Sequence, residues 1–291
     1  MIRPKKIALA IAFSPTAPAM LRAARGLAAR FGATLLLVHI GERTAEAESR
    51  METLLADGFG SVNPEVVWRP AGGDPASRIL DVVQAEGVDL LVAGALKKEN
   101  LIQYYLGTVA RRIMRKADCS VLFLNQPTGE ELEFNHIVVN AEDSPYVREA
   151  IRLACQIGEF NPQSWVHIVK ELKMYGLTMA VSDQCTAEEY EKIRQRLVQE
   201  EIHRVEQMLE KVRHPGLRIN IKVVTGKSGF ELSQFAQRKE ADLLVLGAPG
   251  RRFRLFDRVF PHDQEYIFAD MPCHLLVVHP KVHTKTTTSH G

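Results

Sequence analysis

The chain has 291 residues, of which 46% are hydrophobic and 25% are charged, as in an ordinary globular protein. At about 100–200 residues per domain, this length favours two domains over one. The 37 lysine and arginine residues nearly balance the 35 aspartate and glutamate residues. The resulting net charge of +2 gives no overall attraction to nucleic acid or to an anionic membrane, so we expect neither as a partner.

The N-terminal segment has some features of a secretory signal. A basic start precedes the short apolar run Ile7–Phe13, and the tripeptide Ala17-Pro18-Ala19 follows. That run lies at the lower length limit for such a signal, and a similar segment recurs in the middle of the chain. We therefore interpret it as the first strand of a repeated domain. No apolar run approaches the roughly 18 residues that span a bilayer, so we expect no membrane insertion.

The four cysteines, Cys119, Cys155, Cys185 and Cys273, lie far apart in the sequence. No C-x-x-C motif and no histidine cluster accompanies them, so a zinc site is not expected. Free thiols in a reducing compartment are the plain interpretation. The sequence thus predicts a cytoplasmic protein with no bound metal.

Four segments of the first half recur in the same order in the second half, and such repeats fix the architecture. The four pairs are Lys6–Ile11 with His136–Ala141, Leu37–Ile40 with Trp165–Ile168, Val88–Ala95 with Ala241–Ala248, and Asp118–Leu124 with Pro272–Val278. The polar segment Asn125–Asn135 between the halves is a natural linker. We predict one domain over residues 1–126 and a second over 135–280.

The apolar runs of the first half are short and continuous, as in strands that are buried on both faces of a parallel sheet. They are Ile7–Phe13, Thr34–Ile40, Leu90–Ala93 and Val121–Leu124. Helical patterns separate these runs, and Gly32 and Gly87 are natural helix ends. This alternation predicts an α/β fold, with a doubly wound, open, parallel five-stranded sheet of Rossmann-like type in each half.

The second half carries an insertion between its second and third matching segments. A charged helix with an apolar stripe is expected near residues 187–212, and it most simply packs on its own sheet. The preceding segment, Lys170–Gln184, is predicted to be either a flap over the second half's site or a surface for an unknown protein partner. The tail 281–291 has almost no apolar content and is expected to be disordered.

In an open parallel sheet, ligands bind beyond the carboxyl ends of the strands, where the strand order reverses. The candidate site of the first half is therefore built from the residues after Ile11, Ile40 and Ala93. Gly94 and Gly107 would let backbone N–H groups approach a phosphate. The helix that begins after Gly107 and Thr108 would add a partial positive charge.

Each half resembles the universal stress protein family, and the whole chain resembles a tandem member with two such domains. Nucleotide-binding members carry the motif G-x2-G-x9-G-[S/T] after the fourth strand and an aspartate at the end of the first strand. In the first half Gly94, Gly107 and Thr108 fit the motif, whereas Lys97 replaces its second glycine and Ala12 replaces the aspartate. The nucleotide-binding residues expected from this resemblance are Ala12, Phe13, Ile40, Gly94, Ala95, Lys97, Gly107, Thr108 and Val109.

The second half departs from the motif differently. Glu142 keeps an acid at the end of the first strand, and Gly247 and Gly250 keep the first glycine pair. Phe260 and Pro261 stand where the motif has glycine and serine, and proline has no N–H to offer a phosphate. A second, weaker site is expected at Glu142, Ile168, Gly247 and Gly250.

Three other patterns are most simply structural. The segment Thr225–Gly229 looks like the end of a Walker A loop, but Ile221 stands where that loop requires glycine. His39 and His167 lie in matching Val-His-Ile segments without a visible nucleophile or carboxylate partner, so both are interpreted as hydrogen-bonded structural histidines. Arg251–Arg254 is most simply a solvated loop, although it has the charge to steer an anion.

The resemblance implies a stress-response regulator that binds an adenine nucleotide, ATP with or without Mg²⁺, mainly in the first half. No positioned general base is visible, so at most slow ATP hydrolysis is expected rather than an enzyme. The alternatives are an interaction or scaffold module that binds no nucleotide, or a binder of another small ligand. The family also implies an internal pseudo-dimer that brings Val121–Leu124 near Leu275–Val278. Whether two chains also form a homodimer is left open.

Overall fold

A computed structural model describes most of the chain. The residues described are 3–56, 62–97, 104–125, 132–144, 146–172, 186–226, 229–249, 260 and 264–279. Several predictions lie outside this part: the flap or partner segment from residue 173 to 184, Gly250, the arginine-rich loop, Pro261 and the tail 281–291.

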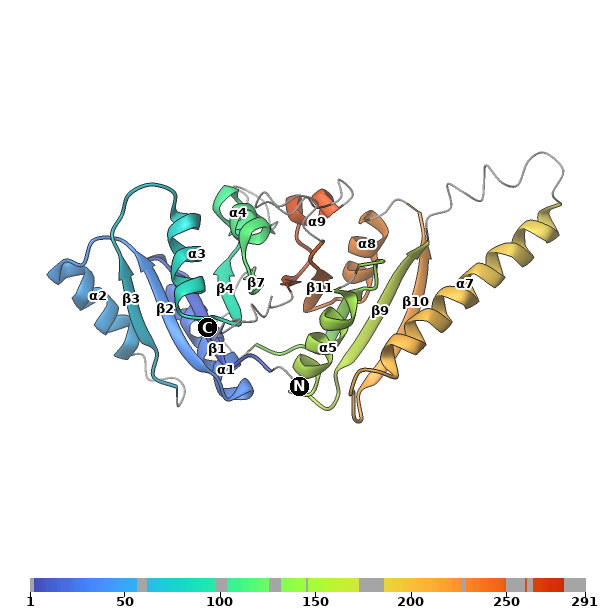
Figure 1. The fold of residues 1–291 in the computed structure, drawn as a ribbon, viewed down its shortest axis with the longest axis horizontal. Coiled ribbons are helices and arrows are strands. Elements are labelled where there is room, and N and C mark those ends of the chain that lie inside the picture. The colour runs from blue at the N-terminus through green and yellow to red at the C-terminus, as the bar shows by residue number, and fades with distance from the viewer. Residues whose placement is uncertain are drawn as a thin grey trace, which may run out of the picture.

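The two halves share one ten-stranded sheet with the order β10-β9-β8-β11-β12-β7-β4-β1-β2-β3 (Figure 1). The first half contributes β1 (Lys6–Ile11), β2 (Thr34–Ile40), β3 (Glu65–Arg69), β4 (Leu90–Gly94) and β7 (Ser120–Leu124). The second contributes β8 (His136–Asn140), β9 (Trp165–Leu172), β10 (Arg218–Thr225), β11 (Leu243–Gly247) and β12 (His274–Val278). Within this ten-stranded sheet, all pairings inside a half are parallel. The predicted pair of five-stranded parallel sheets is confirmed.

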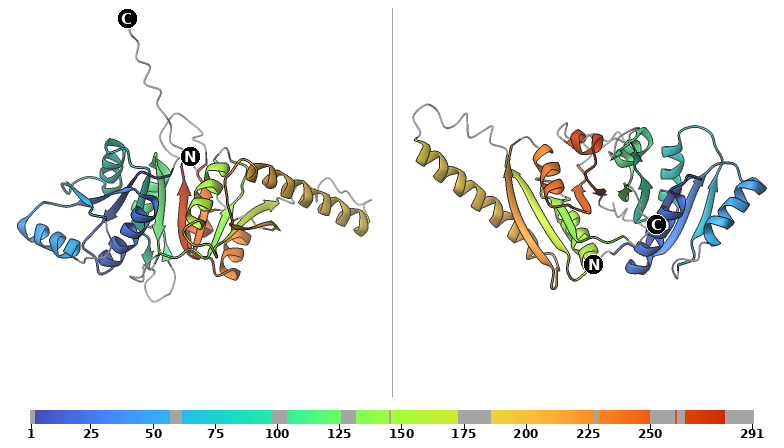
Figure 2. Two further views of the ribbon diagram at one scale, coloured as in Figure 1. Left: turned by 90° about the horizontal axis from the view of Figure 1, so that it is seen from below. Right: turned by 180° about the vertical axis from the view of Figure 1, so that it is seen from behind.

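Helices cover both faces of this sheet, and each face has its own apolar core (Figures 1 and 2). One face carries α1 (Ala17–Phe31), α2 (Ala45–Ala56), α5 (Val147–Gly158) and α7 (Ala187–Leu209). The other carries α3 (Pro75–Ala85), α4 (Thr108–Lys116), α8 (Phe230–Arg238) and α9 (Glu265–Ala269). A short hairpin of β5 (Leu96–Lys97) and β6 (Tyr104–Tyr105) follows β4.

Local sequence explains where the helices start and stop. Gly32 ends α1 with φ of 65°, a left-handed conformation that glycine adopts without strain. Thr186 and Glu189 form a reciprocal capping box at the start of α7. The distal part of α7 extends past the edge of the sheet (Figure 1), and Ile193 of its apolar stripe remains 38% exposed. Only the proximal part of this helix therefore packs on its own sheet, through Val205 and Leu209.

The halves meet where β7 pairs with β12 in the antiparallel sense. Leu122 faces Leu276, and Val121 faces Val277, in a fully buried seam. The backbone N–H of Asn125 donates to Nδ1 of His274 at 3.2 Å, which extends this contact beyond the strands. The expected pseudo-dimer, with the last strands of the two halves side by side, is confirmed.

One carboxylate fixes the start of the first strand in each half. In the first half, Oδ2 of Asp89 accepts from the backbone N–H groups of Lys5 and Lys6 at 2.7 and 2.9 Å. In the second half, Oδ2 of Asp242 accepts from the N–H groups of Asn135 and His136 at 2.7 and 2.9 Å. The aspartate of the repeated Asp-Leu-Leu-Val segment thus holds β4 in register with β1, and β11 with β8.

The two Val-His-Ile segments are not equivalent, and the sequence match between them is wrong. His39 pairs with Ile11 at the end of β1, whereas His167 pairs with Val138 in the middle of β8. The counterpart of His167 in the first half is Leu36, which pairs with Ala8. Both histidines are hydrogen-bonded and buried: Nδ1 of His39 lies 3.0 Å from the carbonyl of Ile11, and His167 lies between His136 and Asn220.

We predict that Asp89→Ala destabilises the protein by about 2 kcal/mol, because the part-buried N–H of Lys6 loses a charged acceptor worth about 1.5–3 kcal/mol, whereas the exposed N–H of Lys5 can bond to water instead. Urea unfolding followed by circular dichroism measures this loss. Asp81→Ala, which removes an exposed aspartate from α3, is the matched control and should change stability by less than about 0.5 kcal/mol. Equal effects of the two substitutions would contradict the proposed role of Asp89.

The protein should lose stability in acid as the His274 imidazole is protonated. Burial lowers the pKa of His274 from 6.5 to about 4, and its Nδ1 must stay unprotonated to accept from Asn125. An unfolded histidine keeps its ordinary pKa, so the unfolded chain takes up the proton first. The stabilisation is present above about pH 6.5 and is lost as the pH falls towards about 4.

Urea unfolding between about pH 7 and about pH 4 tests this prediction. His274→Asn retains an acceptor but no group that titrates there, so its stability should depend less steeply on pH than that of the parent. The control is His203→Asn, on the exposed face of α7, which should leave the slope as it is. An unchanged slope in His274→Asn would show that His274 is not the group responsible.

Candidate functional site

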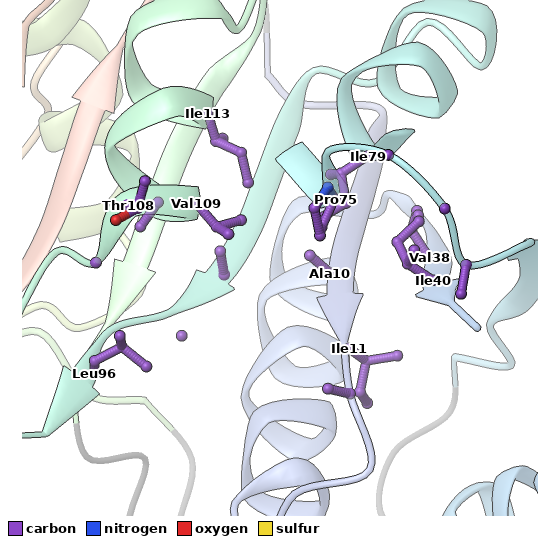
Figure 3. A pocket seen from close by; sticks show the side chains of 18 residues that line it. Ala10, Ile11, Val38, Ile40, Pro75, Ile79, Leu96, Thr108, Val109 and Ile113 are labelled. Carbon is purple, nitrogen blue, oxygen red and sulfur yellow. The ribbon is translucent and has the colours of Figure 1, made fainter. Parts of the chain in front are cut away.

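A cavity of about 660 Å³ lies at the carboxyl ends of β1, β2 and β4, under the first turns of α3 and α4 (Figure 3). This is the reversal point of the first half, because β1 lies between β4 and β2 and the chain crosses to opposite sides of it. The lining residues are Ala10, Ile11, Ala12, Val38, Ile40, Ala71, Gly72, Gly73, Pro75, Ile79, Ala93, Gly94, Leu96, Gly107, Thr108, Val109, Ala110 and Ile113.

The cavity wall is aliphatic apart from one side chain. Val38, Ile40 and Ile79 line one side, and Val109 and Ile113 of α4 line the other (Figure 3). Thr108, at the start of α4, carries the polar lining side chain. Such a cavity suits a ligand with a flat or apolar part, whose polar groups would make contacts at one end of the cavity.

The polar end is the start of α4. Gly107 is the N-cap, with extended φ and ψ of −70° and 176°, and no side chain caps the helix. Within the described part of the chain, no acceptor bonds the N–H groups of Thr108, Val109 and Ala110. They therefore remain available for an anion in the cavity, at the positive end of the helix dipole.

Gly107 also leaves room for Leu96. A Cβ built at Gly107 would come within 2.5 Å of Cδ1 of Leu96, a rim residue that is 52% exposed. Any larger residue at position 107 would push this leucine side chain to a new position. The glycine thus keeps the entrance beside α4 open.

The structure brings together six of the nine residues expected in the first half, namely Ala12, Ile40, Gly94, Gly107, Thr108 and Val109. The other three do not line the cavity. Phe13 packs against His39 with ring centroids 4.5 Å apart. The N–H of Ala95 donates to the carbonyl of Leu124 at 2.8 Å, and Lys97 is exposed on β5. The chain turns away after β4, which carries Lys97 off the wall.

The loop before α3 is the part of the site that sequence reasoning missed. Gly72 and Gly73 line the cavity with φ of 139° and 69°, so the Ala-Gly-Gly-Asp-Pro sequence itself carried the signal. Asp74 follows, caps α3 through the N–H of Ser77 at 2.9 Å and pairs with Arg112 of α4 at 2.7 Å. These hydrogen bonds from Ser77 and Arg112 hold the pKa of Asp74 well below its usual range. The ionised carboxylate thus ties the two helices that frame the cavity.

Of the residues expected in the second half, Ile168 lies away from Glu142 and Gly247. Nε2 of Gln264 donates to Oε2 of Glu142 at 2.7 Å, and Gly247 lies against the backbone of Tyr146. Ile168 is fully buried in the core beneath α5 and α7, on the face of the sheet opposite Gln264, so its assignment to the site is wrong. That error follows from the shifted match between β2 and β9. Gly250 lies outside the described residues.

The described part of the chain shows neither a metal centre nor a reactive thiol. Within the described ranges, no cluster of three or more histidine, cysteine, aspartate or glutamate side chains is placed to hold a metal ion. Cys119, Cys155 and Cys273 are free and buried, and burial raises the pKa of the Cys155 thiol to about 12. No helix of the described part is long and apolar enough to cross a membrane.

Comparison with known proteins identifies both halves with one family. The model of the universal stress protein family matches residues 4–125 and again residues 133–279. A universal stress protein of Methanocaldococcus jannaschii is 36% identical over 58 residues, a stretch that covers 20% of this chain and 34% of that protein.

Two solved structures resemble the whole chain. A functionally unknown protein from Pseudomonas aeruginosa has a TM-score of 0.67 at 17% identity, with 96% of this chain and 93% of that chain covered. A universal stress protein from Archaeoglobus fulgidus has a TM-score of 0.65 at 13% identity, with coverages of 94% and 98%. At these identities, the two structures support the fold alone.

Proposed function

Because this chain belongs to the universal stress protein family, we propose that it is a regulatory protein that binds an adenine nucleotide, ATP with or without Mg²⁺, in the cavity of its first half. The observation that carries the proposal is the cavity itself. Six residues selected from the sequence motif meet on its wall, and the N–H groups that start α4 open into it.

The cavity has an apolar part for a base and a polar part for phosphates, as a bound nucleotide requires. Its aliphatic wall of Val38, Ile40, Ile79 and Val109 suits the faces of a base, because burial of flat apolar surface stabilises the complex by about 25 cal/mol per Å². The start of α4 suits the phosphates, because each charge-assisted hydrogen bond adds about 1.5–3 kcal/mol. The hydroxyl of Thr108, at the start of α4, would contact a phosphate or its Mg²⁺.

The site supports binding rather than rapid catalysis. Among the described residues that line the cavity, Thr108 alone has a polar side chain, and none is a histidine, an aspartate or a glutamate. A water molecule beside the terminal phosphate would therefore meet no general base. We propose slow hydrolysis at most, with the nucleotide acting as a ligand that changes what the protein binds.

The first test is to denature the purified protein and to identify any released small molecule by its mass. Isothermal titration calorimetry with ATP, with and without Mg²⁺, then measures affinity. A dissociation constant in the micromolar to low millimolar range supports the proposal. No co-purified nucleotide and no binding up to about 5 mM ATP would contradict it.

Gly107→Val should weaken ATP binding at least tenfold, because the added side chain displaces Leu96 into the entrance and crowds the N–H groups of α4. The control is Gly26→Ala in α1, where a Cβ meets no atom within 4 Å, so affinity should not change. Calorimetry measures both variants, and circular dichroism checks that each is folded. If Gly107→Val binds ATP as well as the parent does, the nucleotide does not lie at α4.

Ala12→Asp should tighten ATP binding by about tenfold, or about 1.4 kcal/mol, because it restores the acid that the resemblance implies for orienting the base. The residue lines the cavity, so its side chain would meet the ligand. Ala12→Asn tests whether charge is needed, since it has similar volume. An affinity for ATP that falls in Ala12→Asp would show that the base is held elsewhere or that the ligand is not an adenine nucleotide.

One observation favours a second candidate, a different small ligand in the same cavity. With Ala12 in place of an acid, the described residues at the base end of the cavity offer no polar side chain that would distinguish adenine from another flat or apolar group. Mass analysis of co-purified material separates the two candidates directly. A scaffold role without a ligand is the remaining alternative, and it fits only if no small molecule binds.

A further inference from the structure

The axis that relates the two halves passes through the seam between β7 and β12. Leu122 and Leu276 occupy the same position of the two repeats, and they face each other across the seam. Carried back along the chain without a gap, the same match superposes Arg111 of α4 on Glu265 of α9. The turns between helix and strand match as well, because each places a cysteine directly before its strand.

Arg111 and Glu265 also face each other across this axis. Nη1 of Arg111 forms an ion pair with Oε2 of Glu265, and Nη2 of Arg115 lies 4.0 Å from the other oxygen of the same carboxylate. Two identical domains paired in this way would place arginine opposite arginine, or glutamate opposite glutamate, and like charges repel. The contact therefore belongs to the pairing of unlike halves, in which one repeat supplies the cation and the other supplies the anion.

This ion pair is bonded to the segment that leads into α4. Nε of Arg111 donates to the carbonyl of Leu106 at 2.8 Å, so one guanidinium contacts both the carboxylate of Glu265 and this carbonyl. The N–H of Leu106 donates to the carbonyl of Phe268 in α9 at 2.9 Å. Leu106 is buried, so water does not replace these bonds. Both backbone groups of Leu106 are thus held, one by α9 directly and the other by Arg111.

The bonded carbonyl belongs to the peptide that starts α4. Leu106 directly precedes Gly107, which is the N-cap of this helix. Because the peptide between these two residues is planar, fixing the carbonyl of Leu106 also fixes the orientation of the N-cap. The N–H groups of Thr108 and Val109 follow on the wall of the cavity. The direction in which α4 presents these groups therefore depends on a guanidinium that the second half holds.

The second half has no equivalent of this arrangement at the start of α9. Pro261 stands at the position of Gly107, and Glu265 stands at the position of Arg111. A glutamate carboxylate has no N–H with which to hold the carbonyl that precedes its own helix. The second half thus keeps the charge that the first half needs for its loop, but it lacks the donors that a phosphate needs.

We propose that Glu265 of the second half is a positioning residue for the phosphate end of the first-half cavity, which it orients through Arg111. The proposal rests on the nucleotide function proposed above for that cavity. Glu265 is not among the lining residues. It holds the guanidinium of Arg111, the guanidinium holds the carbonyl of Leu106, and this peptide orients the start of α4. The first-half site is then complete only when the second half is paired with it.

Calorimetry on the full chain compares ATP with adenosine, which fills the base end of the cavity but has no phosphates. Glu265→Gln and Arg111→Ala should each weaken ATP binding by at least about tenfold and change adenosine binding by less than about twofold. Glu188→Gln, which removes an exposed acid from α7, is the matched control and should bind both ligands as the parent does. Equal losses for ATP and adenosine, or an unchanged affinity for ATP, would overturn the proposal.

The charge-swapped variant R111E/E265R separates positioning from the pairing of the halves. It keeps an ion pair across the axis, so its urea unfolding midpoint should match that of the parent. The carboxylate introduced at position 111 cannot donate to the carbonyl of Leu106, so ATP binding should remain at least about tenfold weaker than in the parent. Recovery of ATP affinity in this variant would show that the pair only holds the halves together, which would overturn the proposal.

A measurement without ligand distinguishes a failure of this proposal from a failure of the nucleotide function. In ¹⁵N-labelled protein, the backbone N–H signals of Thr108, Val109 and Ala110 should shift in Glu265→Gln and stay in place in Glu188→Gln. If the parent binds no ATP up to about 5 mM, the nucleotide function fails, and these signals decide the role of Glu265. Signals at the start of α4 that do not respond to Glu265→Gln would overturn that role.

Discussion

The antiparallel pairing of β7 with β12 is the contact on which the rest of the molecule depends. Each half alone would end in a strand with unpaired backbone groups and apolar side chains on both faces, which is a surface prone to aggregation. Val121, Leu122, Leu276 and Val277 are at most 1% exposed because the halves cover each other. The tandem chain thereby closes within one molecule an interface that separate domains would have to form by association.

This seam also ties the two candidate sites together. The N–H of Leu106, directly before Gly107, donates to the carbonyl of Phe268 in α9 at 2.9 Å. Arg111 of α4 pairs with Glu265 of α9, and its Nε donates to the carbonyl of Leu106 at 2.8 Å. The loop that would hold a phosphate in the first half is therefore bonded to the short helix α9, whose N-cap residue Gln264 donates to Glu142. A change in the position of either helix must alter contacts of the other.

The sequence predicts the central strands of the sheet well, because strands that are buried on both faces are continuous apolar runs. Continuous apolar runs located the central strands, whereas half-exposed β3 and β10 lie at the sheet edges and leave a weaker pattern. The sequence match between β2 and β9 is shifted along the strand. The register of buried parallel strands is hard to predict, because their residues are similarly apolar at every position. Lys97 and Phe13 were misplaced because the path of a chain after its strand depends on tertiary packing. Gln264 was missed because its partner, Glu142, is distant in the sequence.

The repeat shows how two sites on one fold can diverge while the strand pairing around them is kept. Most residues that pack each core stay apolar in both halves, and Asp89 and Asp242 hold equivalent strands in the same way. The lining positions face a cavity in the first half, so substitutions there change few packing contacts. Ala12 in one half and Glu142 in the other therefore alter what each site can bind, while the shared sheet keeps both sites in place.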